Sequence, residues 1–97
     1  MAVKDIIGTL GMPAECGTVI SKGKSYSQNA EIVDLLLSAG AIVMGKTATS
    51  ELAYLGPSKT SNPHDYSRTP GGSSSGSAAS VASCMAPLSI GSQTGGS

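Results

Sequence analysis

The sequence predicts an α/β fold, and three observations carry that prediction. Apolar residues recur at helical spacing over residues 30–39, and Gly40 follows as a stop signal. The run over residues 41–44 comes directly afterwards and is short, apolar and β-branched, as expected of a strand buried on both faces. A second helix, over residues 77–85, precedes another short apolar segment at residues 87–90. Helices that alternate with buried strands are typical of α/β proteins.

The elements of the first half are predicted as follows. Residues 2–7 form a short apolar segment interrupted by Lys4 and Asp5, which suits a strand end or a loop entering a buried site. Glycines, Pro13 and polar residues dominate residues 8–27, so we expect an irregular connection there. Ser27 or Asn29 can cap the helix over residues 30–39.

In the second half, Thr49 or Ser50 can start a short helix that runs through Leu55 and ends at Gly56-Pro57. Residues 58–70 are rich in turn-forming residues and are predicted to be a surface loop or the rim of a site. The helix over residues 77–85 carries such small side chains that another backbone segment could pack closely against it.

Length and composition limit the classes of protein that this sequence can represent. The chain has 97 residues, which allows one domain at most, and it contains no Trp or Phe. Because so few large apolar side chains are available, we expect it to be part of a larger globular fold. Six Lys and Arg balance six Asp and Glu, so the chain has no electrostatic footprint for nucleic acid or an anionic membrane. We expect neither partner.

The sequence gives no sign of a metal or cofactor. Cys16, Cys84 and the single histidine, His64, form no ligand cluster, so two free thiols in a reducing compartment are expected. A phosphate-cradling loop is an alternative for the glycine-rich segments, but they lack a Gly-Lys-Ser/Thr ending and the dinucleotide-binding glycine spacing. There is no secretion signal and no apolar run of membrane-spanning length. We therefore expect a soluble, cytoplasmic protein.

Two serine-glycine stretches, residues 71–77 and 91–97, carry the chemistry. A hydroxyl on a glycine-rich turn can project into a cleft while nearby backbone N–H groups point at a developing oxyanion. Ser97 can then act as a nucleophile, Lys4 as a base made neutral by burial, and Ser73 as a proton relay. Such stretches are more often flexible linkers, but a linker would not run straight into an apolar helix and strand.

These segments closely resemble the signature block of the amidase signature hydrolases. The resemblance rests on residues 70–82 and 87–97, together with Val3-Lys4-Asp5, Gly45-Lys46-Thr47 and Glu51-Leu52-Ala53 in the same order. It covers essentially the whole chain, so residues 1–97 are expected to be a partial amidase signature domain, truncated at both ends. It implies an α/β/α fold with a mixed sheet.

The resemblance also implies an activity, the hydrolysis of carboxamides through an acyl-enzyme without a metal or cofactor. Ser97 resembles the nucleophile, Lys4 the base, and Ser73 the bridging serine, which the family holds on a cis peptide bond. The backbone N–H groups of Thr94, Gly95, Gly96 and Ser97 would form the oxyanion hole. Ser74 would orient the turn or bind a small-molecule amide substrate.

Several alternatives stay open. Lys46 is a rival base, although its place after a buried strand suits a structural role, and His64 fits a loop or rim role better than catalysis. The glutaminase component of the glutamyl-tRNA amidotransferase is a second interpretation, but Gln93 stands where that component carries Asp. A third is a non-catalytic remnant. Because Ser97 is the last residue, we expect this chain alone to be inactive, and its substrate and oligomeric state stay open.

Overall fold

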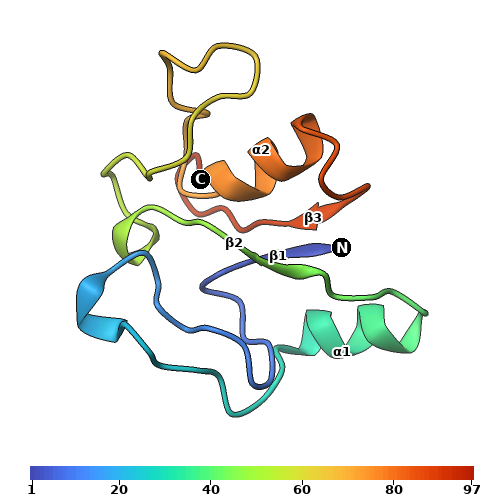
Figure 1. Cartoon of the computed structure of the whole chain (residues 1–97). Coiled ribbons are helices and arrows are strands. Elements are labelled where there is room, and N and C mark those ends of the chain that lie inside the picture. The colour runs from blue at the N-terminus through green and yellow to red at the C-terminus, as the bar shows by residue number, and fades with distance from the viewer.

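Three short parallel strands form the centre of the fold in a computed structural model that describes all 97 residues (Figure 1). The strands are β1 (Ala2–Lys4), β2 (Gly45–Thr47) and β3 (Ser89–Ile90), in the sheet order β2-β1-β3. The middle strand therefore pairs with two strands that lie far from it in the sequence, Val3 being opposite both Lys46 and Ile90.

Two helices cover the two faces of this sheet. The helix α1 (Glu31–Ser38) lies on one side and α2 (Ser75–Ala82) on the other (Figure 1). Val33 of α1 packs with Val3 and Met1 in the apolar core. Since side chains alternate along a strand, Lys4 points to the opposite face from Val3, toward α2. The α/β prediction is confirmed, and both strand pairs of the sheet are parallel.

Several element boundaries differ from the predictions. The helix expected over residues 30–39 is α1, but the strand expected over residues 41–44 is wrong, because β2 begins only at Gly45. Ile42 and Met44 are 76% and 65% exposed, so this run is not buried on both faces. It approaches Met1 through two hydrogen bonds, from Met44 N to Met1 O and from Met1 N to Ile42 O, before regular pairing starts.

The other predicted elements are present in shorter or shifted form. The segment over residues 2–7 is a strand only to Lys4, and the strand expected over residues 87–90 is β3 alone. The helix expected to end at Leu55 is a single 3₁₀ turn, η2 (Glu51–Ala53). The helix expected over residues 77–85 begins and ends earlier, as α2.

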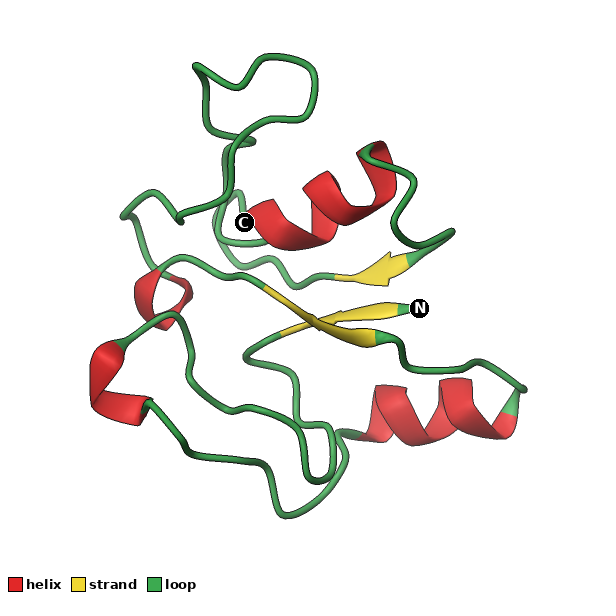
Figure 2. Cartoon of the chain, viewed as in Figure 1, coloured by secondary structure: helices red, strands yellow, loops and turns green.

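Irregular chain makes up most of the molecule (Figure 2). The first long connection contains one 3₁₀ turn, η1 (Val19–Ser21), and two isolated bridges, one from Leu10 to Tyr26 and one from Pro13 to Ser25. Residues 58–70 form the predicted loop, which projects from the body of the molecule (Figure 2).

Close packing between α2 and the segment after β2 fixes the layer that carries Lys4. A Cβ atom on Gly76 would lie 2.5 Å from the backbone N and O of Ala48, which is too close for any side chain. The Gly76 N–H also donates to the Ala48 carbonyl at 3.1 Å. The expectation that this small-residue helix packs directly against another backbone segment is confirmed.

Candidate active site

The side chain of Lys4 is completely buried at the carboxyl end of the middle strand. Its Nζ lies 2.7 Å from Ser73 Oγ, 2.9 Å from Ser74 Oγ and 3.0 Å from Ser92 Oγ. No carboxylate pairs with it. Because burial penalises the charged ammonium, the pKa of Lys4 is lowered from the ordinary lysine value. A neutral amine at this position can accept a proton from a serine hydroxyl.

The turn before α2 presents Ser73 to this lysine. Gly71 and Gly72 both have positive φ angles, 81° and 65°, a conformation that glycine adopts without steric strain. Ser73 is 3% exposed, and its carbonyl accepts hydrogen bonds from Thr49 Oγ1 at 3.0 Å and from the Ser50 N–H at 3.4 Å. The backbone of Ser73 is thus held from the β2 side while its hydroxyl faces Lys4.

Ser97 lies beside this turn without a hydrogen bond from its hydroxyl to Ser73. The Ser97 carbonyl accepts from the Ser74 N–H at 3.2 Å, and the Gly96 carbonyl would lie 3.2 Å from a Cβ on Gly72. Ser73, Ser92 and Ser97 all line one pocket of about 760 Å³. The structure therefore joins Lys4 directly to Ser73 and places Ser97 in the same pocket.

The backbone of residues 94–97 also borders this pocket. None of the N–H groups of Thr94, Gly95, Gly96 and Ser97 donates a hydrogen bond within the chain. A backbone N–H without a partner in the chain can donate to an oxygen of a bound molecule. The cis peptide bond expected at Ser73 is absent, since every peptide bond in the structure is trans.

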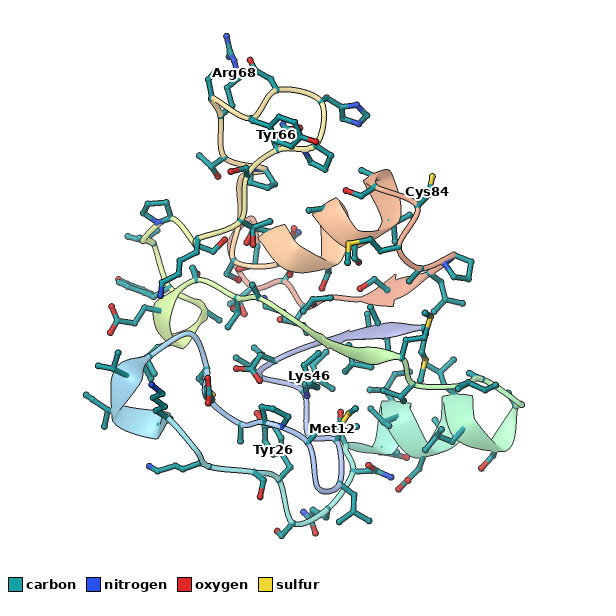
Figure 3. The ribbon with its side chains drawn as sticks, viewed as in Figure 1. Met12, Tyr26, Lys46, Tyr66, Arg68 and Cys84 are labelled. Carbon is teal, nitrogen blue, oxygen red and sulfur yellow. The ribbon has the colours of Figure 1, made fainter.

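The two candidate bases, Lys4 and Lys46, have different hydrogen-bond partners. Lys46 lies on β2, and its Nζ donates to the Ile7 carbonyl and to Thr9 Oγ1, with no serine hydroxyl among its partners. Its ammonium lies 4.8 Å from the centre of the Tyr26 ring, and the two side chains meet below the sheet in Figure 3. Burial lowers the pKa of Lys46, an effect partly offset by Asp5 and Cys16.

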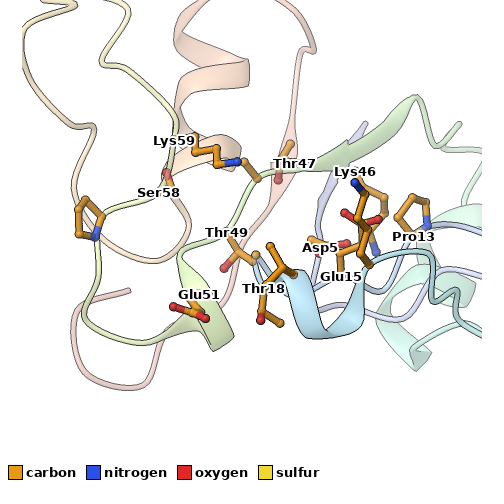
Figure 4. Close-up of a pocket in the computed structure, with 15 residues that line it drawn as sticks. Asp5, Pro13, Glu15, Thr18, Lys46, Thr47, Thr49, Glu51, Ser58 and Lys59 are labelled. Atoms are coloured by element: carbon orange, nitrogen blue, oxygen red, sulfur yellow. The ribbon is translucent and has the colours of Figure 1, made fainter.

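A second pocket, of about 570 Å³, is lined by Asp5, Lys46 and the segment that follows β2 (Figure 4). Asp5 Oδ2 accepts from the Cys16 N–H at 2.5 Å, whereas its buried Oδ1 has no partner within the chain. Burial, together with Cys16 and Asp5, raises the pKa of Tyr26 to about 12. The charged groups of this region are Asp5, Glu15, Lys22, Lys46, Glu51 and Lys59.

Ser74 and His64 are the other residues that the sequence analysis considers for the site. Ser74 is not among the residues that line the pocket of about 760 Å³, and its hydroxyl accepts from Lys4 and the Ser92 N–H and donates to the Ser92 carbonyl. His64 belongs to residues 58–70, the projecting loop on which Tyr66 and Arg68 lie (Figure 3), and its N–H donates to Asn62 Oδ1.

Two polar contacts of the site are not predicted by the sequence. Ser92 stands out only as part of a glycine-serine stretch, although its hydroxyl contacts Lys4. Thr49 stands out only as a possible helix start, although its hydroxyl holds the Ser73 carbonyl. Neither role has a local sequence signal, because each depends on residues at least 24 positions away.

The fold assembles neither a metal-binding cluster nor a membrane-spanning helix. Nowhere do three His, Cys, Asp or Glu residues come together in a way that could hold a metal ion. None of the helices has the length and apolar character needed to span a membrane.

In this α/β protein a buried lysine amine is hydrogen-bonded to serine hydroxyls at the carboxyl edge of a parallel sheet, and two of these serines, Ser73 and Ser92, line a pocket. Comparison with known proteins gives the family. The sequence profile described as Amidase matches residues 1–97, so the chain belongs to the Amidase family of hydrolases.

Individual relatives agree with this assignment. The A-type subunit of the glutamyl-tRNA(Gln) amidotransferase of Methanosarcina mazei is 46% identical over 105 aligned positions, which cover 100% of this chain and 22% of that protein. The crystal structure of an amidase family protein from Bacillus anthracis str. Ames matches with a TM-score of 0.88 and 38% identity, over 96% of this chain and 21% of that one.

A peptide amidase, PAM, solved in complex with the competitive inhibitor chymostatin, matches with a TM-score of 0.85 and 38% identity. This match covers 93% of the present chain and 20% of the amidase. The chain thus spans about a fifth of the length of the relatives that it matches.

Proposed function

We propose that the protein containing this chain hydrolyses a carboxamide C–N bond through an acyl-enzyme on Ser97, with Lys4 as base and Ser73 as relay. The observation that carries the proposal is the fully buried Lys4 amine, 2.7 Å from Ser73 Oγ, behind the wall of a pocket that Ser97 also lines. Membership of the Amidase family supports the same reaction class.

The steps follow from these positions. Neutral Lys4 accepts the proton of the Ser73 hydroxyl, and Ser73 in turn accepts the proton of the Ser97 hydroxyl. The Ser97 oxygen then attacks the carbonyl carbon of the amide. The free N–H groups of residues 94–97 stabilise the oxyanion. The proton held by Lys4 passes back through Ser73 to the leaving nitrogen. The C–N bond breaks, and the amine departs. Water then attacks the acyl-enzyme and releases the acid.

The test compares two lysines with lowered pKa values on neighbouring strands, Lys4, which is fully buried, and Lys46, which is half-buried. In the full-length protein, Ser97→Ala and Lys4→Met should each lower kcat for a simple amide by about a thousandfold or more. Lys46→Met is the matched control, because this lysine also has a lowered pKa but contacts Ile7 and Thr9 rather than serines. Full activity in folded Ser97→Ala, or equal losses in the two lysine variants, would disprove the proposal.

A second candidate function is a glutaminase subunit that supplies ammonia to an amidotransferase. The name of the Methanosarcina mazei relative favours it. Activity confined to glutamine and dependent on partner subunits would establish this alternative. In both candidates the same three side chains perform the hydrolysis, so the variants above test the shared chemistry and the substrate separates the two.

A further inference from the structure

Asp5, the residue after Lys4, is buried, and the proposed reaction gives it no part. Its single side-chain hydrogen bond within the chain comes from the Cys16 N–H to Oδ2 at 2.5 Å, and it forms no ion pair. Its own N–H donates to the Thr47 carbonyl of β2 at 3.0 Å. A carboxylate that accepts from a backbone N–H makes a strong, charge-assisted bond. Asp5 therefore joins the end of the strand that carries Lys4 to Cys16.

Cys16 and Gly17 form a sharp turn that rests against the segment after β2. Both residues have positive φ angles, 51° and 68°, and for Cys16 this conformation carries strain that other contacts must offset. The Cys16 carbonyl accepts from the Leu52 N–H at 2.8 Å. A Cβ on Gly17 would lie 2.7 Å from the Thr49 carbonyl oxygen and 2.9 Å from that of Ser50, so the turn touches backbone directly.

These contacts complete a path from Asp5 to the hydrogen-bond partner of Lys4. Thr49 Oγ1 and the Ser50 N–H hold the Ser73 carbonyl, and the Ser73 hydroxyl lies 2.7 Å from Lys4 Nζ. Asp5 and Thr49 both border the second pocket (Figure 4). A shift of the turn would therefore move the segment that holds Ser73, while β1 keeps Lys4 in place.

Resting on the proposed amidase function, we infer that Asp5 is a positioning residue for the proton relay. Its carboxylate fixes the turn at Cys16 and Gly17, and the turn sets where Ser73 lies relative to Lys4. Asp5 forms no ion pair with the Lys4 ammonium, and burial is the cause of the lowered pKa of that group. Proton transfer requires donor and acceptor within hydrogen-bond reach, so a displaced Ser73 lowers kcat without changing KM.

The experiment measures kcat and KM of the full-length protein for one simple amide. Asp5→Ala removes the acceptor of the Cys16 N–H and should lower kcat about tenfold or more, with KM within about twofold of its original value. Asp5→Asn keeps one oxygen for this hydrogen bond and should retain kcat within about threefold. The midpoint of its pH–rate profile should not move, because the position of Asp5 matters and its charge does not.

A pair of glycine variants tests the same path without altering the carboxylate. Gly17→Ala pushes a methyl group against the Thr49 and Ser50 carbonyls and should lower kcat by about tenfold. Gly11→Ala is the matched control, because Gly11 lies on the same connection with a similar φ of 71° but has no atom within 4 Å of the Cβ position. It imposes the same kind of backbone strain and should leave kcat unchanged.

Equal kcat in Gly17→Ala and Gly11→Ala would overturn the inference, even if Asp5→Ala does not fold. A loss in folded Asp5→Asn as large as that in Asp5→Ala, or a shifted pH–rate midpoint, would also overturn it, because the charge would then carry the effect. Losses confined to KM would do the same. Turnover that persists in Ser97→Ala overturns the amidase proposal, whereas turnover lost in Ser97→Ala but intact in Asp5→Ala overturns the positioning role alone.

Discussion

At the scale of single residues, the protonation of Lys4 controls the proposed chemistry. Burial lowers its pKa, and no carboxylate forms an ion pair with its ammonium that would oppose that shift. Only the neutral amine can accept a proton, so the base is inactive below its pKa and active above it. The three serine hydroxyls around it provide hydrogen bonds without a countercharge, which keeps the neutral form accessible.

The first prediction concerns pH. The kcat/KM of the full-length protein should rise with pH, with a midpoint below that of an ordinary lysine, and then reach a plateau. The reason is that the folded-state pKa of Lys4 is lowered, so the active form accumulates before an exposed lysine titrates. A pH–rate profile for an uncharged amide measures the midpoint. A fall in activity over this range would contradict Lys4 as base.

The second prediction concerns Thr49, which positions Ser73 through its backbone. Thr49→Val keeps the side-chain shape but removes the hydroxyl that donates to the Ser73 carbonyl at 3.0 Å. We expect kcat to fall about three- to tenfold with little change in KM, as a misplaced relay slows proton transfer. Thr49→Ser retains the hydroxyl and should restore most of kcat. Equal losses in both variants would mean that Thr49 acts through packing alone.

At the scale of elements, the contact between α2 and the segment after β2 holds Ser73 opposite Lys4. Gly76 permits this contact because its position leaves no room for a Cβ atom. The third prediction is that Gly76→Ala destabilises the full-length protein by about 1–3 kcal/mol, despite the better helix propensity of alanine. Denaturant unfolding measures the loss. The control Ala78→Ser changes an exposed position of the same helix and should have a much smaller effect.

The same elements indicate how much of the fold can be predicted from the sequence. Helical spacing locates α1 to within a residue at each end, because Val33 must face the core while Glu31 and Asp34 remain outside. The strand predicted after it is misplaced, since an apolar β-branched run looks buried whether or not its partners cover both faces. Ile42 and Met44 show that the rest of the chain covers only one side of that run.

The sequence predicts those residues of the site that belong to short local motifs. The glycine turn at Gly71-Gly72 and the family resemblance identify Lys4 and Ser73, which the structure joins. Local motifs do not predict the contacts of Ser92 and Thr49, because each hydroxyl contacts a residue that is distant in the sequence. The roles of Ser97 and of the N–H groups at residues 94–97 stay predictions.

At the scale of the whole molecule, the apolar core is small. Only 18 of 97 residues are buried, and Lys4 and ten other polar or charged residues are among them. Large apolar side chains such as Ile20, Leu35 and Leu55 are instead exposed, which is more apolar surface than a stable isolated domain usually shows.

The fourth prediction is therefore that the 97-residue chain, prepared alone, is marginally stable and binds a hydrophobic dye. Too little apolar area is removed from water to offset the entropy of ordering the long irregular segments. Dye fluorescence and thermal circular dichroism measure both properties. A sharp, cooperative transition at high temperature without dye binding would contradict it.

The sheet order has a consequence for how the protein acquires its chemistry. Of the three strands, β1 is synthesised first, yet its hydrogen bonding on the β3 side joins distant residues, from Ala2 N to Leu88 O. Such distant pairings form late. The contacts of Lys4 with Ser73 and Ser74 also join residues 69 and 70 positions apart. Until these distant segments pack against β1, Lys4 lacks the serine hydroxyls that surround it in the folded chain, so the proposed base is assembled only as the fold closes.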